Sequence, residues 1–395
     1  MSLTIRSLNS DASFLLTFRP ILPFPPSPGQ AKNEFTVVLD PWLSGASKIW
    51  HPKFSISRHK QEACISTLND LPEPDLVIIS QSKTDHCHQE TLTQLPRSGG
   101  KTLILAEPAA AKMIKGWKHF DSSKLITLSK WEDSRTRPNP TVHRIDLPAL
   151  TPSGLPGEVT ITFIPQKPDL TGLHNAIGIT YRPPTFSHLE ALPDSPPDTP
   201  NSFQSTFSHA VTDRALSVIF SPHGCNYKTL VPYVTSHLIS EAALPLTALL
   251  HCFDRVQNSW YMGGNICAGL PGGSEIAQNL CAKAWISAHD SDKDSSGLAN
   301  LKIKIEKFAR EEVEAVVSPR SEKFPDRRIG TEAVILESGE EITLSGSMDF
   351  GRDEVEKIES VERSESSTLV EAVYQKEPVE KYVGRAESLD SGIAS

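Results

Sequence analysis

The chain of 395 residues lacks several features that would assign it to a specialised class of protein. Its first residues, MSLTIRSLNSDASFLLTF, place no basic segment ahead of a long apolar core, so no secretory signal is predicted. No apolar run approaches the roughly 18 residues of a membrane span. The nearest, SEAALPLTALLHCF, is interrupted by Glu241 and Pro245. We therefore expect an intracellular, cytoplasmic protein that does not associate with a membrane.

Cysteines and basic residues are also scarce. The six cysteines show neither a CxxC pair nor the spacing of a disulfide framework, so reduced thiols are expected. There are 39 Lys and Arg against 48 Asp and Glu, which gives a net charge of −9. Phosphate binding needs concentrated Lys and Arg, so this composition argues against a nucleic-acid partner. A small-molecule substrate is the expected partner, and the sequence does not indicate an oligomeric state.

Proline, by contrast, is plentiful, and the 31 prolines cluster in segments that are expected to be loops. The clearest are residues 19–34 and a Pro-rich insertion at 182–214. We expect one main domain over residues 1–310 and a short β-rich extension over 311–345, with a hairpin around Ser338 and Gly339. Residues 346–395 are acidic and Ser-rich, which predicts a disordered tail.

Short β-like runs dominate the rest of the chain, among them FTVVLD, LVIIS, KTLILAE, EVTITFIP, AIGITYR, ALSVIFSP and AWISAH. Three helices are predicted: residues 106–117, with Pro108 in the first turn; 272–284, with Ser274 as a possible N-cap; and 298–317. Many strands and few helices, without strict alternation, favour two sheets with helices outside them.

Four of the strand-like runs end in polar residues that can carry chemistry. VVLD ends in Asp40, and LVIIS is followed by Asp85 and His86. The runs VIFSPHG and AWISAHD carry His223 and His289. Groups just beyond a buried strand are held by a rigid frame and still reach solvent, so such positions are favoured for functional sites.

In this order the four strand ends resemble the metallo-β-lactamase superfamily, in its branch of broad hydrolases whose first motif follows an Asp-Pro strand end. VVLDPWLSG is similar to that element, and SQSKTDH to the Ser-His-x-His-x-Asp-His metal motif with both early histidines replaced. AKAWISAHDSDK is similar to the closing strand with its terminal histidine. The resemblance runs from about Phe14 to Ala299. It implies a four-layer αββα sandwich of the mixed α/β (α+β) class.

Members of this family bind two metal ions, and the resemblance implies that this chain has lost the first site. The positions of the two early histidines hold Gln81 and Lys83, and the third histidine position holds Gln166 or Lys167. A protonated Lys cannot ligate a divalent ion, and Gln is a weak ligand. The metal motif is therefore degenerate at its first site.

The second site of the family is implied to survive, with four ligands: Asp85, His86, His223 and His289. His223 takes the place of a bridging aspartate. Such a set suits one divalent ion, zinc first and manganese or iron as alternatives, and leaves room for water. Asp85 could instead orient the nucleophile. Asp40 is expected to orient a ligand histidine and not to bind metal itself.

Each of these residues also has a simpler structural interpretation. Asp85 could cap a helix that begins near Gln89, and His223 could be a turn residue. The DSDKD run beside His289 could be a cluster of N-cap residues. A shifted register of the motif would replace the ligand set with His88, His174 and Cys225.

The run LLHCFD has the composition of a Cys/His nucleophile, with His251 and Cys252 adjacent to each other. Adjacent residues of a strand point to opposite faces of the sheet. We therefore expect that these two side chains do not face each other.

Two functions follow from these interpretations. The first is a hydrolase in which one divalent ion activates water toward an ester, thioester, amide or phosphoester. In that enzyme Lys83 would project toward the vacated site and stabilise an oxyanion or an anionic substrate. The second is a non-catalytic protein with the same fold and no metal, which binds a metabolite or a protein partner.

Overall fold

A computed structural model of the chain describes residues 1–22, 33–49, 51–133, 135, 141–169, 171–185, 214–259, 261, 264–319 and 330–346. Most of the two Pro-rich segments and nearly all of the acidic tail lie outside these residues, so the predictions for them concern parts that the structure does not describe. None of the helices in the described residues is long and apolar enough to cross a membrane.

The first of two seven-stranded sheets has the strand order β20-β1-β2-β3-β6-β7-β8, and its strands from β3 to β8 run parallel. The strands are β1 (Ser2–Ser7), β2 (Phe14–Arg19), β3 (Phe35–Leu39), β6 (Leu76–Ile79), β7 (Leu103–Ala106), β8 (Leu125–Thr127) and β20 (Glu341–Ser345).

The second seven-stranded sheet has the order β19-β16-β13-β12-β11-β10-β9, and its strands from β12 to β19 run parallel. The strands are β9 (His143–Leu147), β10 (Gly157–Pro165), β11 (Asn175–Arg182), β12 (Leu216–Ser221), β13 (Ala248–His251), β16 (Ala284–Ser287) and β19 (Glu332–Val334).

Two small sheets and several helices complete the described part of the chain. The small sheets are β15-β14-β18 and β17-β5-β4. Their strands are β4 (Ser47–Ile49), β5 (Ser55–His59), β14 (Arg255–Gln257), β15 (Asn265–Ala268), β17 (Lys293–Ser296) and β18 (Lys304–Glu306). The helices are α1 (Gln89–Leu92), α2 (Pro108–Gly116), α4 (Tyr227–Tyr233), α5 (Gly269–Asn279) and α6 (Arg310–Val317). Single turns are η1 (Leu68–Asp70), η2 (Ser122–Lys124), η3 (Val234–Leu238) and η5 (Leu298–Asn300).

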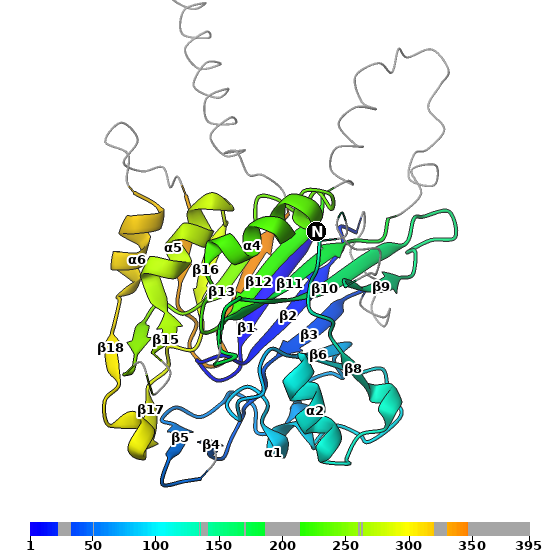
Figure 1. Cartoon of the computed structure of the whole chain (residues 1–395). Coiled ribbons are helices and arrows are strands. Elements are labelled where there is room, and N and C mark those ends of the chain that lie inside the picture. The colour runs from blue at the N-terminus through cyan, green and yellow to red at the C-terminus, as the bar shows by residue number, and fades with distance from the viewer. Residues whose placement is uncertain are drawn as a thin grey trace, which may run out of the picture. The chain divides into compact units, whose positions relative to one another are not determined.

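The large sheets pack face to face, and the helices cover their outer faces (Figure 1). Strand β6 shows how the sequence produces this arrangement, since all four of its residues are buried. Leu76 and Ile78 join the core between the sheets, whereas Val77 and Ile79 join the core beneath α2. Side chains alternate along a strand, so a continuous apolar run fills both layers. The predicted αββα sandwich is confirmed.

Some predicted elements differ from those observed. The helix predicted at 106–117 is confirmed as α2, which is capped by Glu107. Helix α5 begins at Gly269, so Ser274 lies inside it and its hydroxyl donates to the carbonyl of Pro271 (3.3 Å). The helix predicted over 298–317 is confined to α6, because strand pairing with β14 draws residues 304–306 into β18.

The hairpin predicted around Ser338 and Gly339 is wrong. Strand β19 extends the second sheet beside β16, and β20 extends the first sheet beside β1. The turn at Gly339, whose φ is +92°, carries the chain from one sheet to the other. The sequence therefore predicted the turn correctly, but the two strands that it joins do not pair with each other.

Candidate metal centre

Three histidines from distant parts of the chain meet at one edge of the sandwich. His86 lies beyond the carboxyl end of β6, His223 beyond β12 and His289 beyond β16, and all three strands belong to the parallel parts of the sheets. One nitrogen of each ring lies within 4.8 Å of a nitrogen of each of the others. Among the described residues this is the one group of His, Cys, Asp or Glu arranged to hold a metal ion.

Asp40 fixes the orientation of His86, as predicted. His86 Nδ1 donates to Asp40 Oδ2 (2.8 Å), and both side chains are completely buried. The carboxylate also accepts from the backbone N–H of Ser80 (2.7 Å) and from its hydroxyl. Because Nδ1 carries the proton in this bond, the lone pair of a neutral His86 lies on Nε2.

His223 presents the same nitrogen to the centre. Its Nδ1 donates to the carbonyl of Ile266 (3.1 Å), which leaves the lone pair on Nε2. That atom lies 3.1 Å from His86 Nε2. Two neutral rings in these tautomers would point lone pairs at each other, a repulsion that a shared proton or a metal ion between them would relieve.

The electrostatics of the pair favour a cation at this point. Burial lowers the pKa of His86, but the Asp85 and Asp40 carboxylates outweigh it and raise the pKa above its ordinary value. Burial, together with the charges of His289 and His86, holds the pKa of His223 well below the ordinary value. A proton held by this pair therefore belongs mainly to His86.

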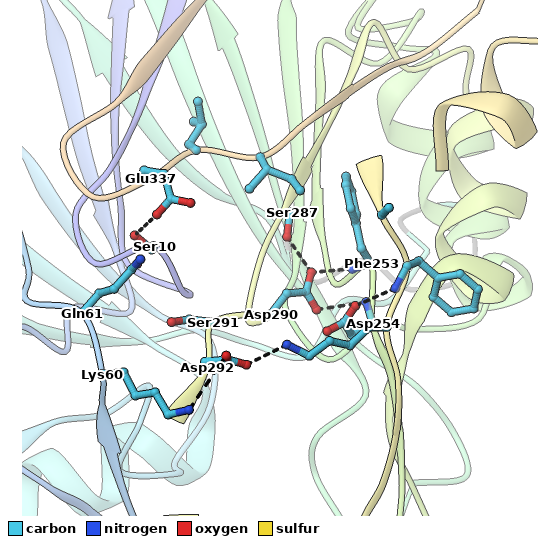
Figure 2. Close-up of a pocket in the computed structure, with 15 residues that line it drawn as sticks. Ser10, Lys60, Gln61, Phe253, Asp254, Ser287, Asp290, Ser291, Asp292 and Glu337 are labelled. Carbon is cyan, nitrogen blue, oxygen red and sulfur yellow. Dashed lines mark hydrogen bonds and ion pairs between the residues drawn. The ribbon is translucent and has the colours of Figure 1, made fainter. Parts of the chain in front are cut away.

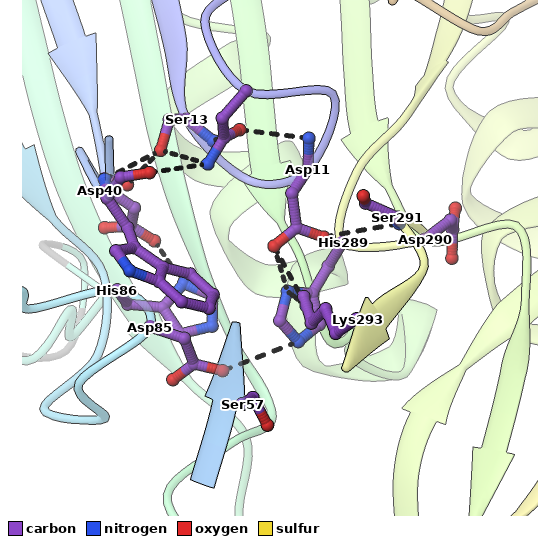
Figure 3. A network of polar contacts seen from close by, with 12 residues as sticks. Asp11, Ser13, Asp40, Ser57, Asp85, His86, His289, Asp290, Ser291 and Lys293 are labelled. Atoms are coloured by element: carbon purple, nitrogen blue, oxygen red, sulfur yellow. Dashed lines mark hydrogen bonds and ion pairs between the residues drawn. The ribbon is translucent and has the colours of Figure 1, made fainter. Parts of the chain in front are cut away.

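His289 completes the triangle of rings. Its ring centroid lies 5.0 Å from that of His86 and 4.3 Å from that of His223. Its Nδ1 lies 3.4 Å from Asp11 Oδ2 and 3.2 Å from Lys293 Nζ (Figure 3). Burial, followed by the charge of Lys293, lowers the pKa of His289. The ring is therefore neutral near pH 7, as a metal ligand must be.

Asp85 supplies a carboxylate beside the three rings. Its Oδ2 lies 3.9 Å from His289 Nε2, and its Oδ1 is buried without a hydrogen-bond partner. Burial raises the pKa of Asp85, but the charges of His86, His289 and Lys293 lower it below the usual value, so the group is ionised. Asp85 does not cap α1, because the N-cap of that helix is His88, whose Nδ1 accepts from the N–H of Thr91.

The chemistry of this donor set fits a divalent ion. Three imidazole nitrogens and an unpartnered carboxylate oxygen are ligands that zinc and similar ions prefer. The charge fits as well. The carboxylates of Asp11, Asp40 and Asp85 outnumber the one ammonium, that of Lys293, by two. With neutral histidines, a divalent cation would balance that excess.

The residues at the implied first-site positions make other contacts. Gln81 Nε2 donates to the carbonyl of Leu173 (2.9 Å), and Gln166 Oε1 accepts from the N–H of Asn226 (2.7 Å). The carbonyl of Lys83 accepts from the N–H of His86 (2.9 Å) and so helps to shape the loop that carries it.

The alternative ligand set does not assemble. Both ring nitrogens of His174 contact backbone carbonyls, those of Gly224 (2.7 Å) and Asn265 (3.0 Å), so neither is available to a metal. His88 Nδ1 is occupied as the cap of α1. The shifted register of the motif is therefore not the one that the fold uses.

The prediction that His251 and Cys252 do not face each other is wrong. Cys252 Sγ lies 3.6 Å from His251 Nδ1. Strand β13 ends at His251, so the alternation of faces no longer applies to the next residue. Both side chains are fully buried, and burial raises the pKa of the Cys252 thiol well above its usual value. The pair is thus a packed contact and not a nucleophile.

Sequence reasoning missed two charged residues of the centre, Asp11 and Lys293. Asp11 lies in the turn between β1 and β2, and Lys293 is the first residue of β17. Asp11 stands alone in a short turn and gives no local signal, whereas the DSDKD run that contains Lys293 suggested only a cluster of N-cap residues. A strained backbone does mark the region, because Asp40 and His289 have φ angles of +39° and +71°. Non-glycine residues adopt such angles at a cost and are enriched at functional sites.

A pocket of about 530 Å³ adjoins the centre at the carboxyl ends of β13, β16 and β19 (Figure 2). Its polar walls include Asp254, Asp290 and Glu337, and none of the three histidines lines it. Asp290 accepts from the N–H groups of residues 253 and 254 and from a serine hydroxyl of β16. The pocket and the centre share the loop that follows His289.

Comparisons with known proteins found one matching family model and several similar solved structures. Residues 30–144 match the family model of a beta-lactamase superfamily domain. The chain is similar to the structure of Igni18, a metallo hydrolase from the archaeon Ignicoccus hospitalis, with 12% identity and a TM-score of 0.42, covering 88% of this chain and 100% of that one. It is also similar to the metallo-beta-lactamase fold protein YhfI from Bacillus subtilis, with 12% identity and a TM-score of 0.40, covering 87% and 99%. No curated protein sequence matches the chain.

The matched segment begins before β3, extends into β9 and contains Asp40, Asp85 and His86. Over these residues the chain is similar to a beta-lactamase superfamily domain.

Proposed function

We propose that the protein is a metal-dependent hydrolase with a single divalent-ion site formed by His86, His223, His289 and Asp85. The observation that carries this proposal is the convergence of three histidines beside a buried carboxylate oxygen that has no other partner. The match of residues 30–144 to a beta-lactamase superfamily domain supports it. Zinc suits this ligand set best, and manganese and iron are alternatives.

When bound, a divalent ion supplies Lewis acidity and a nucleophilic water near neutral pH. The protein's own groups orient the ligands and accept protons. Asp40 and the Ile266 carbonyl keep His86 and His223 in the tautomers that direct Nε2 inward. The free Oδ1 of Asp85 can either ligate the ion or accept a proton from the attacking water. These roles fit hydrolysis of an ester, thioester, amide or phosphoester.

Lys83 is proposed to stabilise negative charge on the substrate. It is half-buried and follows the same strand as Asp85 and His86. If its ammonium contacts a developing oxyanion, Lys83→Met should lower kcat by about 100-fold or more, as the loss of one preorganised donor does elsewhere. Turnover by Lys83→Met and Lys83→Ala equal to that of the unchanged protein would exclude the role.

The first test is metal content, measured by elemental mass spectrometry on purified, tag-free protein. We expect about one metal ion per chain, lost in His289→Ala and in His223→Ala, because each substitution removes one of only four protein ligands. His143→Ala serves as the matched control, since His143 lies on the edge strand β9, outside the cluster. Esters, thioesters, amides and phosphoesters would then be screened with the loaded protein.

The alternative is a non-catalytic protein that binds a metabolite or partner on the same fold. It predicts no bound metal after incubation with zinc, manganese or iron, and no change on substitution of His289. That result would end the metallohydrolase proposal.

A further inference from the structure

A buried ion pair lies directly behind His289. Asp11 Oδ2 lies 2.9 Å from Lys293 Nζ, and the Asp11 side chain is completely buried. Figure 3 shows both groups on the side of His289 that faces away from Asp85. The two residues are far apart in the sequence, one before β2 and the other at the start of β17. A pair this deeply buried is costly to form, so its position next to a candidate ligand calls for a functional reason.

Only Asp11 can orient His289 as a ligand through Nε2. A neutral histidine that ligates through Nε2 carries its proton on Nδ1 and needs an acceptor there. Two groups lie near Nδ1, the Asp11 carboxylate (3.4 Å) and the Lys293 ammonium (3.2 Å). An ammonium only donates, so a His289 that ligates through Nε2 would need Asp11 as its acceptor, and Asp11 Oδ2 is buried without a hydrogen-bond partner. His86 and His223 already have hydrogen-bond acceptors for Nδ1, Asp40 (2.8 Å) and the Ile266 carbonyl (3.1 Å).

Asp11 also holds the backbone of the loop that carries His289. The N–H of His289 donates to the Asp11 carbonyl (3.2 Å), and the N–H of Ser291 lies 3.4 Å from Asp11 Oδ1. The N–H of Asp11 in turn donates to the side-chain oxygen of Asn9 (3.0 Å). These bonds span the residue whose φ is +71°, a conformation that persists only where its surroundings enforce it.

We propose that Asp11 and Lys293 are positioning residues for His289. Asp11 sets the tautomer and direction of the imidazole, and Lys293 holds the Asp11 side chain in place through their 2.9 Å ion pair. The inference rests on the proposed function, since it assigns a role toward the metal ion. It adds an N-terminal turn and the strand after His289 to the parts of the chain that build the site.

The test separates positioning from stability with a pair of substitutions. Asp11→Leu or Lys293→Met alone leaves one buried charge without its partner and should lower the melting temperature. The double variant Asp11→Leu/Lys293→Met removes both charges, and a well-packed apolar replacement of an ion pair is close to neutral for stability. Metal affinity, measured by competition with a chromophoric chelator, should nevertheless fall about 10–100-fold in the double variant.

Two conservative variants keep the inference testable if the double variant does not fold. Lys293→Arg retains the charge and should retain both metal affinity and the visible absorption spectrum of the Co²⁺-loaded protein. Asp11→Asn replaces the carboxylate with a weaker acceptor and should reduce the affinity and alter that spectrum. Circular dichroism checks the fold of each variant.

The outcomes distinguish the two proposals. A folded double variant, or a folded Asp11→Asn, with the affinity and Co²⁺ spectrum of the unchanged protein would overturn the positioning role and leave the metal site standing. Failure of the unchanged protein itself to bind any divalent ion would overturn the proposed function, and this inference with it.

Discussion

Single side chains in this protein decide which nitrogen of each histidine faces the candidate centre. Asp40 shows the effect most directly, because its carboxylate accepts from His86 Nδ1 and is held in turn by Ser80. Its φ of +39° places the carboxylate just past the carboxyl end of β3, beside the end of β6. A residue that never touches the ion can thereby control whether a ligand is available.

Replacement of Asp40 by Asn should weaken metal binding roughly 10–100-fold. An amide that turns its N–H toward Nδ1 favours the opposite tautomer and puts the proton on Nε2. The measurement is the same chelator competition, with Asp75→Asn as control. Asp75 lies at the other end of β6, where its carboxylate accepts from the N–H and hydroxyl of Thr36 (2.8 and 2.9 Å). Equal losses in both variants would contradict a specific role for Asp40.

At the scale of elements, the close packing of α5 on the second sheet supports the strand that carries His289. A Cβ at Gly273 would lie 2.1 Å from Cζ2 of Trp285, a fully buried residue of β16. The Trp285 Nε1 also donates to the carbonyl of His251 (2.9 Å), so the ring cannot move freely to make room. The contact between helix and strand therefore depends on the absence of a side chain.

Gly273→Ala should destabilise the protein by about 1–3 kcal/mol through overpacking, although alanine favours helix formation. Gly116→Ala is the matched control, because a Cβ at the last residue of α2 meets nothing within 4 Å. That change should be neutral or stabilise by up to about 1 kcal/mol. Denaturant unfolding measures both. A Gly273→Ala protein as stable as the control would show that Trp285 relaxes without cost.

For the whole molecule, a buried histidine between helix and sheet links stability to pH. His237 lies in the turn after α4, and its Nε2 lies 3.0 Å from the hydroxyl of Thr160 on β10. Burial lowers the pKa of His237 from 6.5 to about 4. Between these values the unfolded chain binds a proton that the folded chain does not.

The free energy of unfolding should therefore fall as the pH drops from 6.5 to 4, by an amount that His237 shares with the nearby Glu241 carboxylate. His237→Gln can keep a hydrogen bond to Thr160 and removes the titrating group. Its unfolding free energy should depend less steeply on pH in this window. An unchanged slope would mean that His237 is not neutral in the folded state.

The sequence by itself determined the strands and the candidate site residues that follow them. Buried strands such as 76–79 and 216–221 can be recognised from their own apolar residues, and the polar residues that follow them are adjacent in the sequence. Asp40, Asp85, His86, His223 and His289 could all be singled out for that reason. The parallel strands then bring their carboxyl ends to one edge of the fold.

Only the tertiary structure decided what surrounds those residues. Asp11 and Lys293 meet because β17 pairs with β5 and the first turn of the chain reaches the loop of His289. The pairing of β19 and β20 with different sheets, and the contact of Cys252 with His251, likewise depend on where strands end and on which neighbours they find. Interactions between distant segments leave no periodic or local pattern in a single sequence, so no reading of that sequence alone could supply them.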